Sequence, residues 1–355
     1  MLLERSDADP SIADTEDGRT PLSWASERGH EGMVEMLLKR NDVNPNTADT
    51  KYDRTPLWWA ARNGYSGIAR ILLERSDVDL DKADAQYGRT PLSWAAQRGY
   101  KGMVEMLLKR NDINPNRADT QYGRTPLSWA AESGHKEVVE MLLEQNDINP
   151  DTADTQHGRT PLLWAAQSGR EGVVEMLLKR NDVDLNTADT KYGRTPLSWA
   201  AQRGYYGVVE MLLKRDDVSP NTADAKYSRT PLWWAARNGD LEIARMLLER
   251  SDSNLNEVDV QYGRTPLSLA AESGREELVR MLLERNDIDP NIADTQYGRT
   301  PLHWASRNGH QRIATLLQER AGLVPRSDSS LPSMELFPPE PSRLPEPPSK
   351  RRRKF

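Results

Sequence analysis

The feature that most restricts the fold of this chain is a Thr-Pro-Leu sequence that recurs every 35 residues, nine times in succession. Strict periodicity over so many units predicts a solenoid, in which each repeat contacts only its neighbours, in place of two or three ordinary domains. The motifs begin at Thr20, Thr55, Thr90, Thr125, Thr160, Thr195, Thr230, Thr265 and Thr300.

Each unit carries the signals of a helix that starts at the Thr-Pro pair. In the fifth unit, Thr160 suits a helix N-cap because its hydroxyl accepts an unpaired amide hydrogen, and Pro161 suits the next position because it lacks that donor. Leu162 and Ala165 lie on one narrow apolar face that allows a neighbouring helix to approach closely. Gly169 then predicts the end of this first helix.

A second helix follows in each unit. Its apolar arc is too wide for a single contact and indicates burial between the units on both sides. In the fifth unit this arc is formed by Val173, Val174, Met176, Leu177 and Leu178. The sequence therefore predicts an all-α dominated solenoid of stacked helix-turn-helix units, with an extended β-hairpin or finger loop that leads to the next Thr-Pro.

The pattern Thr-Pro-Leu-x-x-Ala-Ala, Gly, Val-Val-x-x-Leu-Leu resembles the ankyrin repeat, and the resemblance covers residues 1 to about 320. Two departures are present: the period exceeds the usual 33 residues by two, and the usual Leu of the first helix is Trp in every unit but one. We place the two extra residues in the finger and its approach, where loop length costs little. The resemblance implies a non-enzymatic protein-binding module.

We divide the chain into three parts on this basis. Residues 1–15 form a partial repeat, because Met1–Arg5 repeats Met281–Arg285, the end of a second helix. Residues 16–320 hold nine repeats, and residues 321–355 form a Pro- and Ser-rich tail that we expect to be disordered. The last second helix is more polar than the others, as a terminal repeat that faces water requires.

The Trp residues are predicted to form a stacked ladder in the core, interrupted by Leu269. Full burial of one such ring contributes about 4–6 kcal/mol by area, as an upper bound. The ladder comprises Trp24, Trp59, Trp94, Trp129, Trp164, Trp199, Trp234 and Trp304.

Aromatic residues at the finger tips are the first candidates for partner binding, because the resemblance implies contacts through the fingers and the concave side. Tyr and Arg are enriched at binding hot spots, and an Arg precedes every Thr-Pro. The alternative is structural: each Arg pairs with a finger aspartate such as Asp154 or Asp189, and each Tyr packs on the next finger. The Tyr candidates are Tyr52, Tyr87, Tyr122, Tyr192, Tyr227, Tyr262 and Tyr297, and His157 holds this position in the fifth unit.

Two further candidates come from variation between units. The segment 54–64 recurs at 229–239, five units later, which indicates a block duplication. Trp58 and Trp233 occupy a first-helix position that is Ser in most units, so we expect exposed anchors there, or partial burial under the neighbouring finger. Arg62 and Arg237, which follow on the same helices, complete this set of partner-binding candidates.

Catalytic, metal and cofactor sites are not predicted. The five histidines lack metal-ligand spacing, Cys is absent, and no phosphate-binding loop or nucleophile motif is present. His30, His135 and His310 follow the glycine that ends a first helix, where ankyrin-like units carry a structural His. We therefore expect no enzyme activity, no cofactor and no small-molecule substrate.

Charge separates the tail from the array. The chain carries a net charge of −6, yet residues 321–355 carry seven Lys or Arg against four Asp or Glu, which leaves −9 on the rest. An acidic array argues against direct nucleic-acid binding, and neither a signal peptide nor a membrane span is apparent. The basic run Lys350, Arg351, Arg352, Arg353 and Lys354 resembles a nuclear localisation signal, which implies importin as a partner.

These features favour a nuclear adaptor or transcription co-regulator that binds proteins, including extended or acidic segments, without a DNA-binding domain of its own. One alternative is a sensor or autoinhibitory array separated from a larger NLR-like signalling ATPase, with a cytoplasmic location. The near-identical units and the start inside a repeat favour that alternative, whereas the basic tail favours the first hypothesis. Another alternative is a substrate adaptor of a ubiquitin ligase.

Overall fold

Every Thr-Pro motif caps a helix in the structure, a computed structural model that describes residues 9–250 and 252–322. In the fourth unit, Thr125 Oγ1 accepts a hydrogen bond from the Ser128 amide at 3.2 Å, and Pro126 is the first helical residue. Gly134 ends this helix with a φ of 84°, the left-handed region that glycine tolerates. The predicted start and stop signals are confirmed.

The described residues contain nine pairs of helices, each pair made by one Thr-Pro unit. The first helices are α1 (Pro21–Arg28), α3 (Pro56–Asn63), α5 (Pro91–Arg98), α7 (Pro126–Ser133), α9 (Pro161–Gln167), α11 (Pro196–Arg203), α13 (Pro231–Asn238), α15 (Pro266–Glu272) and α17 (Pro301–Arg307). The second helices are α2 (Glu31–Leu38), α4 (Ser66–Leu73), α6 (Lys101–Leu108), α8 (Lys136–Leu143), α10 (Glu171–Leu178), α12 (Tyr206–Leu213), α14 (Leu241–Glu249), α16 (Glu276–Leu283) and α18 (Gln311–Arg320).

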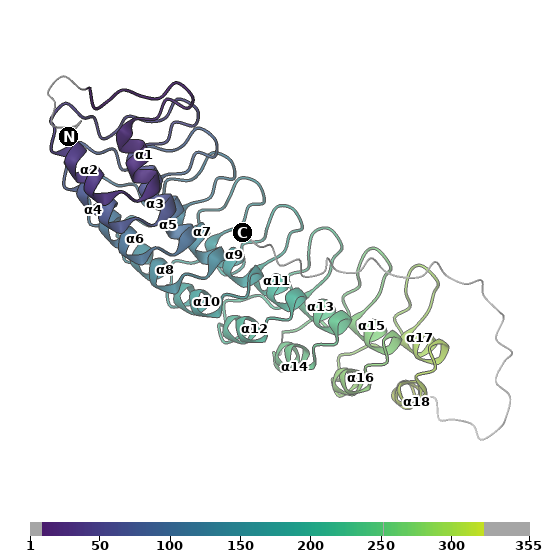
Figure 1. The fold of residues 1–355 in the computed structure, drawn as a ribbon. Helices are drawn as coiled ribbons and strands as arrows, with labels where there is room; N and C mark the ends of the chain where they lie inside the picture. The colour runs from purple at the N-terminus through teal and green to yellow at the C-terminus, as the bar shows by residue number, and fades with distance from the viewer. Residues whose placement is uncertain (1–8, 251, 323–355) are drawn as a thin grey trace.

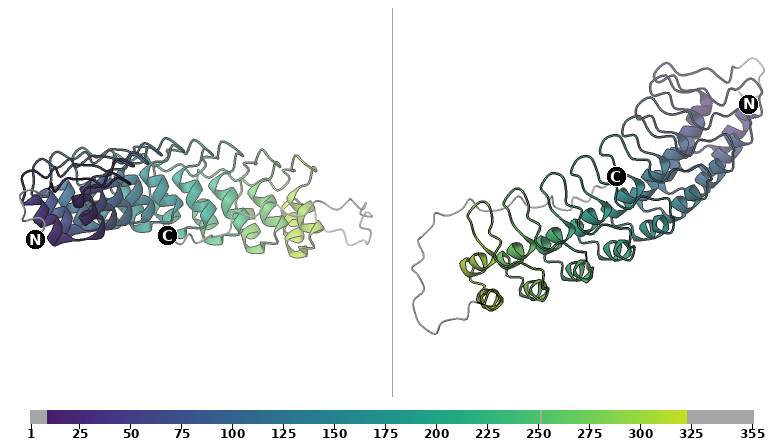
Figure 2. Two further views of the ribbon diagram at one scale, coloured as in Figure 1. Left: turned by 45° about the horizontal axis from the view of Figure 1, so that its top comes forward. Right: turned by 180° about the vertical axis from the view of Figure 1, so that it is seen from behind.

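The pairs stack into a curved solenoid (Figure 1). Each first helix packs on the first helix of the next pair, and each second helix packs on the next second helix. The second helices follow the convex side, and the connecting loops project from the side of the first helices, as the two further views in Figure 2 also show. This arrangement leaves the loops and the first helices to line the concave side.

The loops that lead to the Thr-Pro motifs, which we call fingers, are turns. Residues 9–250 and 252–322 contain no β-strand, so the β-hairpin part of the prediction is not confirmed. In the fifth finger, the Asp154 amide donates to the Arg159 carbonyl at 3.0 Å. The Thr155 amide donates to the Tyr122 carbonyl of the preceding finger at 2.8 Å. Successive fingers share one or two backbone hydrogen bonds of this second type, which are too few to form a sheet ladder.

The core runs through all nine repeats between the two layers of helices. Four apolar side chains of the fifth repeat are fully buried: Leu162, Val173, Val174 and Leu177. Met176 and Leu178 are partly buried and pack against this core. No helix in the described part of the chain is both long and apolar enough to cross a membrane.

The two ends of the solenoid differ. At the last repeat, Gln311, Arg312 and Glu319 are exposed on α18, as the polar terminal helix predicts. At the first repeat, Met33 on α2 is 41% exposed, whereas the equivalent Ile68 of the next repeat is 1% exposed. Residues 1–8 of the predicted partial repeat and residues 323–355 of the predicted tail lie outside the described residues.

A second set of contacts ties the convex side together. Near the end of a second helix, an Arg pairs with the Asp two residues later and also donates to a carbonyl of the preceding repeat. Arg180 illustrates this: it lies 2.6 Å from Asp182 and 2.9 Å from the Leu143 carbonyl oxygen. The Arg180 side chain holds the pKa of Asp182 below its usual value through this hydrogen bond. The repeat pattern alone does not reveal this clamp, because the acceptor carbonyl belongs to the preceding repeat.

Candidate functional site

The concave side is built on a row of Trp and Arg side chains. In the fifth repeat, Trp164 Nε1 donates to Asp154 Oδ2 at the base of its finger, at 3.0 Å. The Arg124 guanidinium of the preceding finger lies 3.5 Å from the centroid of this ring and 4.4 Å from that of Trp129. The guanidinium therefore bridges the rings of two successive repeats, as cation–π contacts.

The predicted Trp ladder is thus corrected: successive rings are separated by arginines instead of being stacked on each other. Trp24, at the end of the array, is also only half-buried. The Arg before each Thr-Pro is present in all nine units, so the sequence indicates that it matters. Its presence alone does not show that it lies between two Trp rings. Arg54 contacts the two rings of its own repeat, Trp58 and Trp59. The arginines that contact both the ring of their own repeat and that of the next are Arg19, Arg89, Arg124, Arg159 and Arg194.

The arginines also bond to the first helix that follows them. Arg124 pairs with Glu132 at 2.7 Å, whereas Arg89 donates to the neutral Gln97 at 2.9 Å. A pairing with a finger aspartate, as the structural alternative proposed, is found for Arg19 with Asp17 at 3.3 Å, Arg159 with Asp189 at 3.8 Å and Arg194 with Asp224 at 3.4 Å. The residue at the first-helix position is therefore one of two sources of a carboxylate for the finger arginine.

Four of the finger-tip tyrosines, Tyr87, Tyr122, Tyr192 and Tyr297, pack on the Trp of their own repeat. Tyr122 and Trp129 meet edge to face with ring centroids 6.1 Å apart, and Tyr192 and Trp199 do so at 5.9 Å. The alternative prediction, in which each tyrosine packs on the next finger, therefore names the wrong partner for these rings. The rings of Tyr52, Tyr87, Tyr122, Tyr192, Tyr227 and Tyr262 are half-buried, and that of Tyr297 is exposed. Each of these seven rings keeps part of its surface open to a partner.

Trp58 and Trp233 are not exposed anchors, so that expectation is wrong. They are 1% and 3% exposed. Trp58 Nε1 donates to Asp84 Oδ2 at 3.2 Å and to the Arg89 carbonyl at 3.0 Å, both in the next finger. Trp233 Nε1 donates to the equivalent Arg264 carbonyl at 3.1 Å. Each extra ring is wedged between its own helix and the next finger, which agrees with the predicted alternative of burial under the neighbouring finger.

The extra ring at Trp58 changes the hydrogen bonds of the next repeat. Asp84 Oδ2 is the acceptor that the Trp94 indole would use if repeat 3 followed the pattern of Trp129 with Asp119. The buried Trp94 Nε1 has no hydrogen-bond partner among the described residues, and the same holds for Trp59 Nε1 and Trp234 Nε1 in the two repeats that carry the extra ring. The local geometry of repeats 2 and 3 therefore departs from the common pattern.

Arg62 and Arg237 lie near the ends of α3 and α13, above the paired Trp rings. The Arg62 guanidinium is 5.5–5.8 Å from the centroids of Trp58, Trp59 and Trp94. Burial lowers the pKa of Arg237 below its ordinary value. Neither arginine has an ion pair with a carboxylate in the described residues.

A pocket of about 580 Å³ opens on the concave side over repeats 2–4. Its wall contains four of the candidates, Trp58, Arg62, Tyr87 and Tyr122. The remaining lining residues are Arg54, Gln86, Arg89, Trp94, Gln97, Arg98, Gln121 and Ser133. The structure thus brings one group of candidates from three repeats into a single site.

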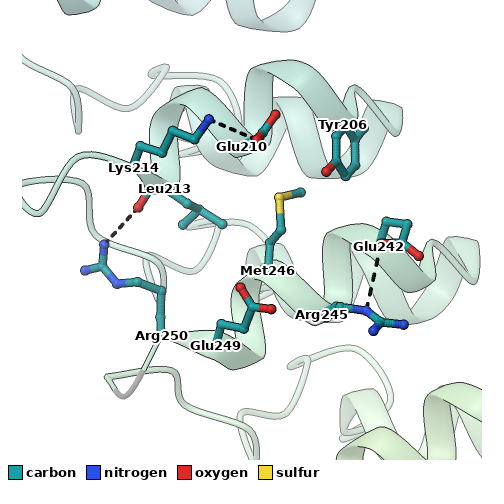
Figure 3. A pocket seen from close by; sticks show the side chains of 9 residues that line it. All are labelled: Tyr206, Glu210, Leu213, Lys214, Glu242, Arg245, Met246, Glu249 and Arg250. Carbon is teal, nitrogen blue, oxygen red and sulfur yellow. Dashed lines mark hydrogen bonds and ion pairs between the residues drawn. The ribbon is translucent and has the colours of Figure 1, made fainter.

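A second pocket, of about 350 Å³, lies on the convex side between α12 and α14 (Figure 3). Tyr206 and Met246 form its apolar part, and Tyr206 is 47% exposed. Most of its charged side chains have ion-pair partners, such as Lys214 with Glu210 at 2.9 Å and Arg245 with Glu242 at 3.8 Å. A site whose charges are mostly paired offers less to a charged ligand than the concave pocket does.

The predicted structural histidines are confirmed at two positions. The Nε2 atoms of His135 and His310 lie 3.0 and 3.1 Å from the carbonyl oxygens of Gln97 and Glu272, in the preceding repeat. The candidate localisation residues Lys350, Arg351, Arg352, Arg353 and Lys354 lie outside the described residues.

Paired short helices, glycine stops and projecting turns, repeated in register, define a helical-repeat solenoid. The family model for ankyrin repeats matches residues 1–84, 76–154, 149–224, 186–259, 219–294 and 254–326. The chain therefore belongs to the ankyrin-repeat family, whose members are typically non-enzymatic protein-interaction modules. No curated relative matches the chain.

Proposed function

We propose that this chain is a nuclear adaptor: its concave side holds an extended segment of a partner protein, and its basic C-terminal run directs the complex to the nucleus. The observation that carries the binding part is the row of half-buried finger-tip tyrosines beside buried arginines. Four of these rings already pack on a Trp, so a partner that covers them loses little additional side-chain entropy.

An extended partner fits this surface better than a compact one, because the contact groups recur along the whole array. Finger tips in successive repeats are joined by backbone hydrogen bonds, such as that from Thr190 to the His157 carbonyl at 2.7 Å. The row is therefore continuous along the stack, and the finger arginines favour segments that contain acidic residues.

Peptide selection tests the binding part. A library of random peptides displayed on phage is selected on the purified chain, and the enriched peptides are tested on Tyr87→Ala with Tyr122→Ala. We expect binding to fall in this double variant and to remain in Tyr206→Ala, which changes an exposed tyrosine of the convex side. Failure to enrich any peptide, or equal loss in both variants, would contradict a concave binding side.

The nuclear part is supported by the sequence of the tail alone. An N-terminally tagged chain is expected to accumulate in the nucleus, and the version with Lys350–Lys354 changed to alanine is expected to lose this accumulation. The same pair of proteins is tested for binding to importin in a pull-down. A cytoplasmic signal in both versions would overturn the nuclear role and leave the binding role intact.

A further inference from the structure

The concave pocket over repeats 2–4 is lined by four arginines and no carboxylate. They are Arg54, Arg62, Arg89 and Arg98. Arg98 is exposed, and neither it nor Arg62 has an ion pair in the part of the chain that the structure describes. Arg62 also acts on Arg54 as a neighbouring like charge, and burial lowers the pKa of Arg54. An anion in the pocket would relieve both effects.

The finger arginines of this pocket bond to neutral partners, unlike those of adjacent repeats. Arg54 donates to Gln86 at 2.8 Å and Arg89 donates to Gln97 at 2.9 Å. In repeats 1 and 4 the corresponding arginines bond to Glu27 at 2.8 Å and Glu132 at 2.7 Å. The positive region is therefore confined to about two repeats and is bounded by a carboxylate on each side.

The duplicated block provides a second copy of this arrangement, five repeats later, with four changes among the lining residues. Leu269 replaces Trp94, Glu272 replaces Gln97, Ser273 replaces Arg98, and Asn308 replaces Ser133. Glu272 lies 2.6 Å from Arg264, the equivalent of Arg89. One finger arginine is thus neutralised and one positive charge is lost, so the copy lacks the excess of arginines.

We propose that the pocket over repeats 2–4 binds a carboxylate side chain, Asp or Glu, of the partner segment, and that its copy over repeats 7–9 does not. This inference rests on the proposed binding function and specifies its chemistry. Arg62 and Arg98 contact the carboxylate, while Tyr87 and Tyr122 contact the adjoining peptide. Arg is suited to this role because its planar guanidinium matches a carboxylate with two parallel hydrogen bonds.

A single acidic side chain fits the charge pattern better than a nucleic-acid strand. A phosphate backbone requires a basic surface that continues along the strand. Here Glu27 and Glu132 flank the pocket, and residues 1–320 carry a net negative charge. The pocket volume of about 580 Å³ accommodates a side chain with its neighbouring backbone.

The test compares peptide selections on three proteins: the wild-type chain, Arg62→Gln with Arg98→Ser, and the matched control Arg237→Gln. These replacements should preserve folding, because both already occur at the equivalent positions of other repeats. Gln occupies the position of Arg62 in repeats 3, 5 and 6, and Ser occupies the position of Arg98 in repeats 4, 5 and 8. Far-UV circular dichroism checks this directly. A peptide selected on the wild-type chain and its version with Gln in place of Glu are then titrated against all three proteins.

We expect the wild-type chain and Arg237→Gln to enrich one acidic position, and the acid-to-amide change to weaken binding roughly tenfold or more. In Arg62→Gln with Arg98→Ser, the enrichment disappears and the two peptides bind alike. Peptides enriched without an acidic position would overturn this inference and leave the proposed function standing, whereas no enriched peptide at all would contradict the proposed function. Displacement of the peptide by an equimolar single-stranded dT oligonucleotide would identify a general polyanion site and overturn the inference.

Discussion

At the residue scale, the choice of Trp in place of the usual Leu is explained by its three simultaneous contacts. The indole of Trp129 buries a large apolar surface, donates to Asp119 at 2.9 Å, and presents its faces to Arg89 and Arg124. A leucine supplies only the first contact. The ring contacts add about 0.5–2 kcal/mol each to the bonds with Gln97 and Glu132 that compensate the nearly buried guanidiniums for the loss of water.

Trp129→Ala should destabilise the array by about 3–5 kcal/mol, because a cavity opens beside two arginines that lose their ring contacts. Urea unfolding followed by far-UV circular dichroism measures this loss as a lower transition midpoint. The control is Trp24→Ala at the end of the array, where the ring is only half-buried and the loss should be smaller. Equal midpoints for Trp129→Ala and the wild-type chain would remove this ring from the core.

The sequence predicts residues whose role is local better than residues whose role depends on the next repeat. Thr125 and Gly134 act on their own helix, so their capping roles follow from type and position. The burial of Trp58 depends on the finger that contains Asp84, 26 residues later in the chain. The position of Arg89 depends on the ring of Trp129 in the following repeat. Such geometry requires the packing of two units and is not contained in the pattern of one.

At the element scale, the second helix of repeat 7 differs from the others. α14 is one residue longer than α12, and Arg250 after it has an extended backbone with a ψ of 125°, whereas Lys214 after α12 remains helical. Ser253 then takes the position that Val218 holds in the preceding repeat, and its Oγ donates to the Leu247 carbonyl. The junction between repeats 7 and 8 thus has less apolar packing than its neighbours, a difference that Leu269 increases.

Ser253→Val should raise the midpoint of unfolding, by about 1 kcal/mol in free energy, because it restores an apolar side chain at a buried position. The reciprocal change Val218→Ser should lower the stability by about 1–3 kcal/mol, since it places a hydroxyl in the same kind of site. Both are measured by urea unfolding. A stability loss in Ser253→Val would show that the hydroxyl contact outweighs the added apolar burial.

At the scale of the whole molecule, the clamps of the convex side make stability depend on pH. Their arginines lower the pKa of the paired aspartates below the ordinary value of 3.8 through hydrogen bonds. The pairs are Arg40 with Asp42, Arg75 with Asp77, Arg110 with Asp112, Arg180 with Asp182, Arg215 with Asp217, Arg250 with Asp252, and Arg285 with Asp287. Their number, and not the strength of any one exposed pair, makes the effect measurable.

The melting temperature should therefore be maintained above about pH 4 and fall as the pH decreases further. A carboxyl with a lowered pKa stabilises the folded state above its unfolded pKa, and this contribution is lost as the pH falls through the folded value. Asp81 and Asp151 act in the opposite direction, because burial raises their pKa. Circular dichroism melts between pH 7 and pH 3 measure the balance.

The control for this prediction removes three of the carboxylates together, as Asp182→Asn, Asp217→Asn and Asp287→Asn. This variant should be less stable than the wild-type chain at pH 7 and should lose less stability on acidification. Parallel pH profiles for the two proteins would show that the clamps do not cause the acid sensitivity.

The hydrogen bonds between repeats also determine when each part of the chain can fold. The bond from His310 to the Glu272 carbonyl joins residues 38 positions apart, and no side-chain hydrogen bond in residues 9–250 and 252–322 spans more. Each repeat therefore finds its partners within the next unit to be synthesised, and low contact order favours rapid folding. During translation the solenoid can lengthen by one repeat at a time behind the ribosome, with only its most recent end waiting for a neighbour.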